Sequence, residues 1–153
     1  IKTDYKTILA HLHNIIDKYD IDLTAIGYDP HNASAFLLDL EDFGCDLVEI
    51  KQSARSLNDA TIDFQLEVKA HNVEYDKKNK LLTRSMNDAI LSEPNSFGEI
   101  KIDKMLQKVR IDPCDAIIDA HKLAMGAEVE EITTDQSIEA YLKMFEKAGV
   151  KED

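Results

Sequence analysis

Tryptophan is absent from this chain of 153 residues, and cysteine, proline and glycine are scarce, with two, three and five copies. Two cysteines, Cys45 and Cys114, build neither a disulfide framework nor a zinc site, and no local spacing supports a thiol nucleophile. We therefore expect two reduced thiols, as in cytosolic proteins. Low-complexity segments are absent as well, so the sequence favours a single folded domain over residues 1–153.

Long apolar runs and several familiar motifs are also missing. No stretch approaches the roughly 18 to 20 apolar residues needed to span a bilayer, and the N-terminus lacks the pattern of a signal peptide. There is no GxxxxGK[ST] phosphate loop, no GxGxxG and no GxSxG, and the five histidines show no HExxH spacing. These absences predict a chain that is neither membrane-bound nor secreted and that does not hydrolyse nucleotides through a phosphate loop.

Basic residues are outnumbered by acids, 18 to 30, which gives a formal net charge of −12. This balance argues against binding DNA or RNA by charge alone, because phosphate contacts need lysine and arginine. The surplus lies at the two ends, since residues 51–126 carry twelve acids and twelve bases. A polyanion could meet this neutral middle, especially with the help of a divalent metal ion.

Apolar periodicity predicts alternating helices and strands. We expect a first helix capped by Asp4, a later helix with Asp112 at its N-cap and Pro113 in its first turn, and a hairpin that turns at Pro94, Asn95 and Gly98. The expected strands cover 23–28 and 45–51, the hairpin covers 89–102, and the expected helices cover 5–19, 32–43, 57–73, 81–89, 111–125 and 134–148.

The stretch "AIGYDPHNA" ends a buried strand in an acid and a proline. Short connections through the next helix predict that strands 23–28 and 45–51 are parallel neighbours with a right-handed crossover. Ligands in such sheets gather at the carboxyl ends of the strands, where Asp29 would lie. The second strand would bring Lys51, Gln52 and Arg55 to the same edge.

Two aspartates stand out by position, Asp29 at a strand end and Asp112 at the head of a helix, and Asp115 lies three residues after Asp112 on the same side. Carboxylates brought together in this way bind Mg²⁺ or Mn²⁺, and two such ions can promote phosphodiester hydrolysis. The structural alternative is that Asp112 is an N-cap and Asp29 a turn residue, because aspartate is favoured at both positions.

Four stretches occur in order along most of the chain: "IGYDPHNA", "LVEIKQS", "SLND" and "KMLQKVRIDPCDAIIDAHKLA". Together they resemble the C-terminal nuclease domain of the large terminase subunit of tailed bacteriophages. That family has a strand ending in Tyr-Asp-Pro, a next strand ending near a glutamine, and a late Lys/Arg-Ile-Asp motif that opens a helix. "YDP" alone is a weak signal, but its combination with "RIDPCDA" is more specific.

The resemblance implies an α/β, RNase H-like fold with a mixed central sheet flanked by helices. It implies an endonuclease that cuts concatemeric viral double-stranded DNA during genome packaging, with Mg²⁺ or Mn²⁺ in a two-metal site. Asp29 and Asp112 would then be catalytic metal ligands, Asp115 an auxiliary ligand, and Lys104 a phosphate contact. We add Lys51 and Arg55 as candidate DNA contacts because of their place at the predicted strand edge.

One feature of the family is missing. Its first metal-binding acid lies on a strand upstream, whereas Asp4 precedes a helix and Asp20 and Asp22 fall in a turn. We therefore expect a fragment of a larger terminase large subunit that lacks the first strands and the ATPase domain. His31 also stands where the family commonly has tryptophan.

The resemblance implies as partners double-stranded DNA, the terminase ATPase domain, the small terminase subunit and the capsid portal, in the cytoplasm of a bacterial host. Two other functions stay open. The acidic segment from Asp135 to Lys147 favours a non-catalytic docking module that binds the portal or a partner subunit. A resolvase or transposase relative with an RNase H-like fold would act on branched DNA.

Overall fold

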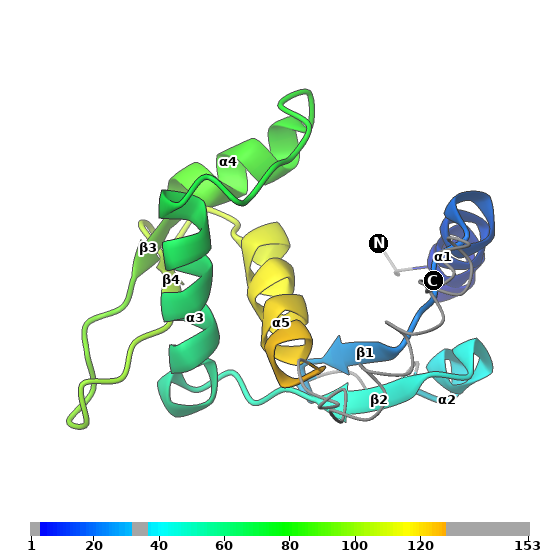
Figure 1. Cartoon of the computed structure of the whole chain (residues 1–153), viewed down its shortest axis with the longest axis horizontal. Coiled ribbons are helices and arrows are strands. Elements are labelled where there is room, and N and C mark those ends of the chain that lie inside the picture. The colour runs from blue at the N-terminus through cyan, green and yellow to red at the C-terminus, as the bar shows by residue number, and fades with distance from the viewer. Residues whose placement is uncertain (1–3, 32–36, 128–153) are drawn as a thin grey trace, which may run out of the picture.

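The computed structural model describes residues 4–31 and 37–127. Within these ranges helices and strands alternate, as the sequence predicts, in a mixed α/β arrangement (Figure 1). The helices are α1 (Tyr5–Tyr19), α2 (Leu37–Leu40), the 3₁₀ helix η2 (Glu41–Phe43), α3 (Ala54–Lys69), α4 (Lys80–Asp88) and α5 (Asp112–Ala127). The strands are β1 (Ala25–Tyr28), β2 (Asp46–Glu49), β3 (Ala89–Leu91) and β4 (Ile102–Lys104).

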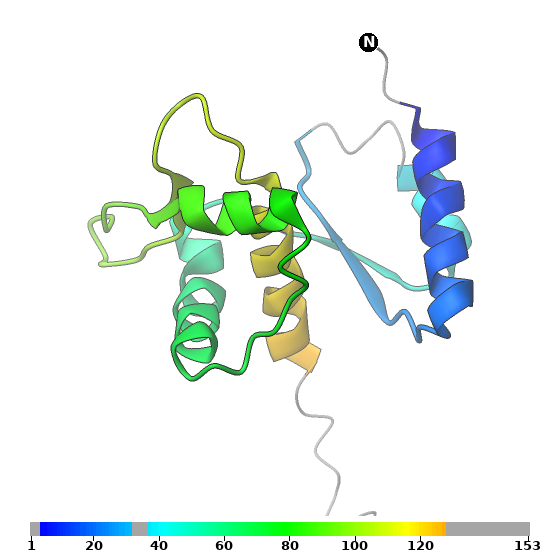
Figure 2. The same ribbon diagram turned by 90° about the horizontal axis from the view of Figure 1, so that it is seen from above.

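The strands of the described ranges form two separate pairs, where we expected one mixed sheet. β1 and β2 pair in parallel, with Ala25 opposite Asp46 and Tyr28 opposite Glu49. β3 and β4 pair antiparallel, with Ala89 opposite Lys104. The two pairs lie on opposite sides of α5, and Figure 2 shows β1 and β2 between α5 and α1.

The predicted caps and the predicted pairing of β1 with β2 are present, while the predicted helix 32–43 is described only from Leu37, as α2 and η2. The Asp4 side chain accepts a hydrogen bond from the backbone N–H of Thr7 at 3.3 Å, which confirms the predicted N-cap of α1. Gly44 ends η2 with a φ of 67°, a left-handed conformation that glycine adopts without strain. The parallel pairing of β1 and β2 is confirmed, so their carboxyl ends meet at one edge.

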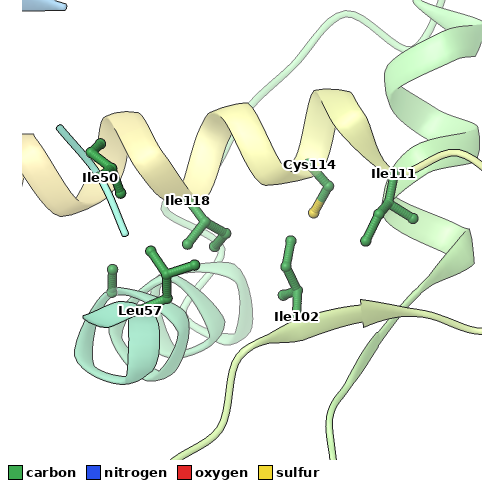
Figure 3. Close-up of a cluster of buried hydrophobic side chains, with 7 residues drawn as sticks. Ile50, Leu57, Ile102, Ile111, Cys114 and Ile118 are labelled. Atoms are coloured by element: carbon green, nitrogen blue, oxygen red, sulfur yellow. The ribbon is translucent and has the colours of Figure 1, made fainter. Parts of the chain in front are cut away.

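The hydrophobic core lies where α3, α5 and β4 meet (Figure 3). Ile50, which follows β2, and Ile118 of α5 are each only 1% exposed. The other members of the cluster are Leu57, Ala60, Ile102, Ile111 and Cys114. Because this core draws α5 against both α3 and the end of β2, it fixes one face of α5 beside the carboxyl edge of the parallel pair.

The β3–β4 hairpin has the predicted turn. The Asn95 side chain accepts hydrogen bonds from the N–H groups of Phe97 and Glu99, and Gly98 has a φ of 78°. The hairpin is joined to α3 by the Asn58 side chain, which accepts from the N–H of Ile100 at 2.9 Å.

No helix in the two described ranges is long and apolar enough to cross a membrane. The predicted last helix, 134–148, and the acidic segment that favoured a docking module lie outside the described residues.

Candidate functional site

The carboxyl edge of the parallel pair carries Asp29 and Gln52, two of the residues that the sequence predicts there. The N–H of Ile50 donates to the carbonyl oxygen of Tyr28 at 2.9 Å, so the two strands stay paired up to their last residues. Asp29 and Gln52 leave the sheet immediately beyond this bond. The position of Asp29 at the end of a strand is therefore as the sequence predicts.

Asp29 has the local turn role that we considered as an alternative. Its Oδ1 accepts a hydrogen bond from the N–H of His31 at 2.9 Å, which forms an Asx turn after the strand. The residue is exposed, and its negative charge also acts on a second carboxylate, that of Asp119. A turn role and a ligand role for Asp29 are thus compatible.

Gln52 ties this strand edge to α5. Its side-chain nitrogen donates to both carboxylate oxygens of Asp119, at 3.1 and 3.0 Å, and to the carbonyl of Ile50, two residues earlier, at 3.2 Å. All three bonds are partly buried. They hold the Asp119 carboxylate in one orientation at the carboxyl end of β2.

Burial raises the pKa of Asp119, the hydrogen bond from Gln52 lowers it, and the charge of Asp29 raises it again. The contribution of Asp29 is smaller than those of burial and of the Gln52 hydrogen bond. Repulsion between like-charged carboxylates is relieved when a cation binds between them. Asp119 also lines a groove of about 310 Å³ between β1 and α5, which makes it accessible from solvent.

Asp112, Asp115 and Asp119 follow one another at spacings of three and four residues along α5, so they form an acidic stripe on one face of the helix. Burial raises the pKa of Asp115 to about 6. The charge of Lys101 opposes this shift, and the carboxylates of Asp119 and Asp112 both add to it. The charge of Asp115 therefore interacts with those of both Asp112 and Asp119 in the acidic stripe.

The N-cap explanation for Asp112 receives no support from the hydrogen bonds. α5 begins at Asp112 itself, and the N–H of Cys114 donates to the buried Ser85 hydroxyl at 3.0 Å. Ser85 belongs to α4, so this side-chain contact at the start of α5 comes from a neighbouring helix. The N–H of Asp115 bonds to the carbonyl of Ile111 at 2.9 Å. In the part of the chain that the structure describes, no hydrogen bond engages the Asp112 carboxylate.

The charge of Asp29 acts on Asp119, while Asp112 lies further along the helix. Seven residues of helix separate Asp112 from Asp119, a rise of about 10 Å. Within residues 4–31 and 37–127 no group of three or more histidine, cysteine or acidic side chains is close enough to hold a metal ion. Sequence reasoning missed Asp119, although its i+4 spacing from Asp115 within "RIDPCDAIIDA" is a usable signal.

The predicted basic contacts fall in two places. Lys51 and Arg55 are exposed near the Gln52 edge. Lys104 lies apart from them, at the end of β4, and lines a polar pocket of about 190 Å³ together with Asp112 and Asp115.

The donor atoms at this edge suit a hard divalent cation. Asp29 and Asp119 supply carboxylate oxygens, and neither cysteine lines the groove beside Asp119. Mg²⁺ and Mn²⁺ prefer such oxygen ligands and commonly bind through one or two carboxylates, with water and phosphate in the remaining positions. The residues present therefore fit a cation of this class, with Asp115 and Asp112 as further carboxylates along the acidic stripe.

Comparison with known proteins gives two findings. Residues 1–128 match the family model described as "Terminase large subunit, endonuclease domain". The crystal structure of the HK97 bacteriophage large terminase resembles this chain with a TM-score of 0.67 and 24% identity, over 79% of this chain and 25% of that chain. This chain thus spans about a quarter of the HK97 protein, and a likeness at this identity concerns the fold. No curated protein matches the sequence.

Proposed function

The chain belongs to the family of terminase large subunit endonuclease domains, and from this premise we propose that it is a metal-dependent DNA endonuclease with its centre at Asp29 and Asp119. The substrate is the concatemeric double-stranded DNA of a bacteriophage, and the reaction is hydrolysis of a phosphodiester bond.

The observation that carries this proposal is the contact that brings Asp119 of α5 to the carboxyl edge of the parallel pair, where Asp29 lies. Gln52, just beyond β2, donates to both carboxylate oxygens of Asp119, and the charge of Asp29 also acts on Asp119. The repulsion between carboxylates at a solvent-accessible edge is relieved when a cation binds between them, which supports a ligand role beside the structural ones.

Each residue of the site has a defined task in this proposal. Asp29 and Asp119 hold the cation, and Gln52 orients the Asp119 carboxylate through two hydrogen bonds. Asp115 and Asp112 extend the carboxylate surface for a second ion. A divalent cation bound here would stabilise negative charge on the phosphate oxygens and assist deprotonation of the attacking water.

The wider setting follows from the family. We infer an RNase H-like nuclease domain of a packaging motor, which works with an ATPase domain, a small terminase subunit and the capsid portal in the cytoplasm of the bacterial host. The excess of acids over bases predicts weak affinity for DNA in isolation, so these partners would bring the substrate to the site.

The test is cleavage of plasmid and linear duplex DNA in Mn²⁺ or Mg²⁺, combined with titration of Mn²⁺ by calorimetry. We expect cleavage that EDTA abolishes, and loss of both cleavage and Mn²⁺ binding in Asp29→Asn and in Asp119→Asn. Asp39→Asn is the matched control, because it removes one exposed acid from α2 and should preserve both properties.

Asp112→Asn and Asp115→Asn measure how far the metal centre extends along α5. If Asp112→Asn abolishes Mn²⁺ binding while Asp119→Asn preserves it, the centre lies at the head of the helix and our assignment is wrong. Faster cleavage of four-way junctions than of linear duplex would instead support a junction resolvase.

A further inference from the structure

A groove of about 180 Å³ lies beside the hydrophobic core and shares no lining residue with the groove at Asp119. We call it the β3 groove. Residues of α3, α4, β3, β4 and α5 line it, among them Phe64, Met86 and Ile118. None of the residues described along its walls is charged, so the groove favours a neutral occupant over an ion.

The β3 groove follows one edge of the β3–β4 pair. Ala89, Ile90 and Leu91, the three residues of β3, all line it. Successive side chains of a strand point to opposite faces of the sheet, so a groove that reaches all three runs along the edge rather than over one face. Within the described ranges β3 pairs with β4 alone, which leaves its other edge without a partner strand. An extended segment of another polypeptide can add to such an edge.

The β3 groove has an apolar rim and a buried hydroxyl in its wall. Ile90 and Leu91 are each 41% exposed, whereas Thr61 of α3 is only 2% exposed. Among the described residues the Thr61 hydroxyl finds no hydrogen-bond partner. A buried hydroxyl in this condition is unfavourable, because it has lost its contact with water without gaining another bond. An occupant that carries one hydrogen-bonding atom would remove this cost.

The size and the walls of the β3 groove suit an aromatic ring. An apolar cavity of roughly 150 Å³ is sufficient to bind benzene. Phe64 and Met86 line the groove, and a phenyl ring and a thioether both interact favourably with a second aromatic ring. The side chain of tyrosine combines such a ring with a hydroxyl that donates and accepts hydrogen bonds, and it therefore matches both the walls and Thr61.

We propose that the β3 groove is a docking site for an extended segment of a partner protein, which pairs with β3 and inserts a tyrosine side chain. The ring of this tyrosine fills the groove, and its hydroxyl bonds to Thr61. Backbone hydrogen bonds along β3 provide affinity, and the inserted side chain provides selectivity, as in other cases of strand addition. The inference does not depend on the proposed nuclease function, since neither Asp29 nor Asp119 lines the groove.

The test of the tyrosine subsite uses p-cresol, the analogue of a tyrosine side chain, and toluene, which lacks the hydroxyl. Titration of the full chain, followed through the backbone amide signals in NMR spectra, gives a dissociation constant for each compound, and the signals of Thr61 and β3 should shift. Thr61→Val should lower the preference for p-cresol over toluene by about 2- to 10-fold, the usual net effect of one hydrogen bond. Valine has nearly the shape of threonine and removes only the hydroxyl, so the variant should stay folded.

The matched control is Thr83→Val. The Thr83 hydroxyl donates to the carbonyl of Asn79 at 2.9 Å, and Thr83 does not line the β3 groove. This variant should leave the preference for p-cresol over toluene unchanged. An equal preference in Thr61→Val and in the unsubstituted chain, or no binding of p-cresol to the unsubstituted chain, would overturn the subsite.

A short peptide, acetyl-Thr-Thr-Tyr-Thr-Thr-amide, tests the pairing with β3. It should bind more tightly than p-cresol by roughly 5-fold or more, because backbone hydrogen bonds add to the contact of the ring. The same peptide with N-methylated backbone amides cannot donate these bonds and should lose the gain. A peptide that binds no more tightly than p-cresol would contradict the addition of a strand at β3.

Discussion

The side-chain nitrogen of Gln52 donates to both carboxylate oxygens of Asp119, across 67 positions of sequence. This contact joins the carboxyl end of β2 to the middle of α5 and holds Asp119 toward the edge where Asp29 lies. Groups that orient a metal-binding carboxylate commonly affect affinity as strongly as some direct ligands. Gln52 is therefore expected to position the metal ligand.

Gln52→Leu should reduce Mn²⁺ affinity by roughly 10 to 100-fold, the usual effect of removing such an orienting partner. Loss of this hydrogen bond also removes an influence that lowers the pKa of Asp119, so the variant should need a higher pH for half-maximal Mn²⁺ binding. Calorimetry between pH 5 and 8 measures both effects. Gln107→Leu, at an exposed position between β4 and α5, is the control, and an equal loss there would contradict a specific role for Gln52.

The approach of β1 to α5 depends on Gly27. A Cβ atom at this position would come within 3.0 Å of the Leu123 methyl group and would contact the buried Ile50 side chain even more closely. Gly27→Ala should therefore lower the free energy of unfolding by about 1 to 3 kcal/mol through overpacking. It should also weaken Mn²⁺ binding, because it pushes Asp29 away from Asp119. Urea denaturation and calorimetry test the two effects.

Gly126→Ala is the matched control for this substitution. Gly126 lies in α5, and nothing approaches within 4 Å of the position that its Cβ would take. Alanine is favoured over glycine in a helix, so this variant should gain up to about 1 kcal/mol of stability. If both variants change stability in the same direction, Gly27 is not a packing constraint.

Ser85 is fully buried, and its hydroxyl accepts the N–H of Cys114 in the first turn of α5. Ser85→Ala should cost about 1 to 2 kcal/mol in urea denaturation, since it removes a buried hydrogen bond from a helix start. Thr83→Ala removes a hydroxyl that donates to the carbonyl of Asn79, the N-cap of α4, near the surface, and it should cost less than about 0.5 kcal/mol. Equal costs would show that the Ser85 bond does not stabilise α5.

Local patterns were sufficient to predict most elements and the position of Asp29 at the end of a strand. The caps at Asp4 and Gly44, the parallel pair and the turn at Asn95 and Gly98 all follow from residues close in sequence, and all are confirmed. The separate β3–β4 pair was predicted as a hairpin, but its separation from β1 and β2 depends on packing around α5, which no local pattern records.

The site shows the same division between local and distant information. The place of Asp29 follows from the strand that ends before it. Which carboxylate of α5 lies nearest to Asp29 depends instead on the position of the helix along the sheet. One turn of helix moves a residue by about 5.4 Å, so Asp112, Asp115 and Asp119 were all compatible with the sequence. Our proposal chooses Asp119 because of its contact with Gln52, which is visible only after folding.

Asp115 should make stability depend on pH. Its pKa is raised from 3.8 to about 6 by burial, so the folded state holds the proton more tightly than the unfolded state does. The contribution of this group to stability is therefore fully present below pH 4, declines as the pH rises toward 6, and is absent above it. Asp115→Asn cannot ionise, so it should lack this decline.

In EDTA, the free energy of unfolding of Asp115→Asn relative to the unsubstituted chain should increase between pH 4 and 6 and stay constant above pH 7. A pKa difference of this size corresponds to at most about 3 kcal/mol, and solvent screening at a half-buried group reduces the expected gain to about 1 to 2 kcal/mol. Asp39→Asn, at an exposed position, should show no such increase. Addition of Mn²⁺ should make the unsubstituted chain more stable than Asp115→Asn, because the Asp115 carboxylate gains a cation that asparagine binds poorly. A stability difference that is independent of pH would show that Asp115 is not held in its protonated form by the fold.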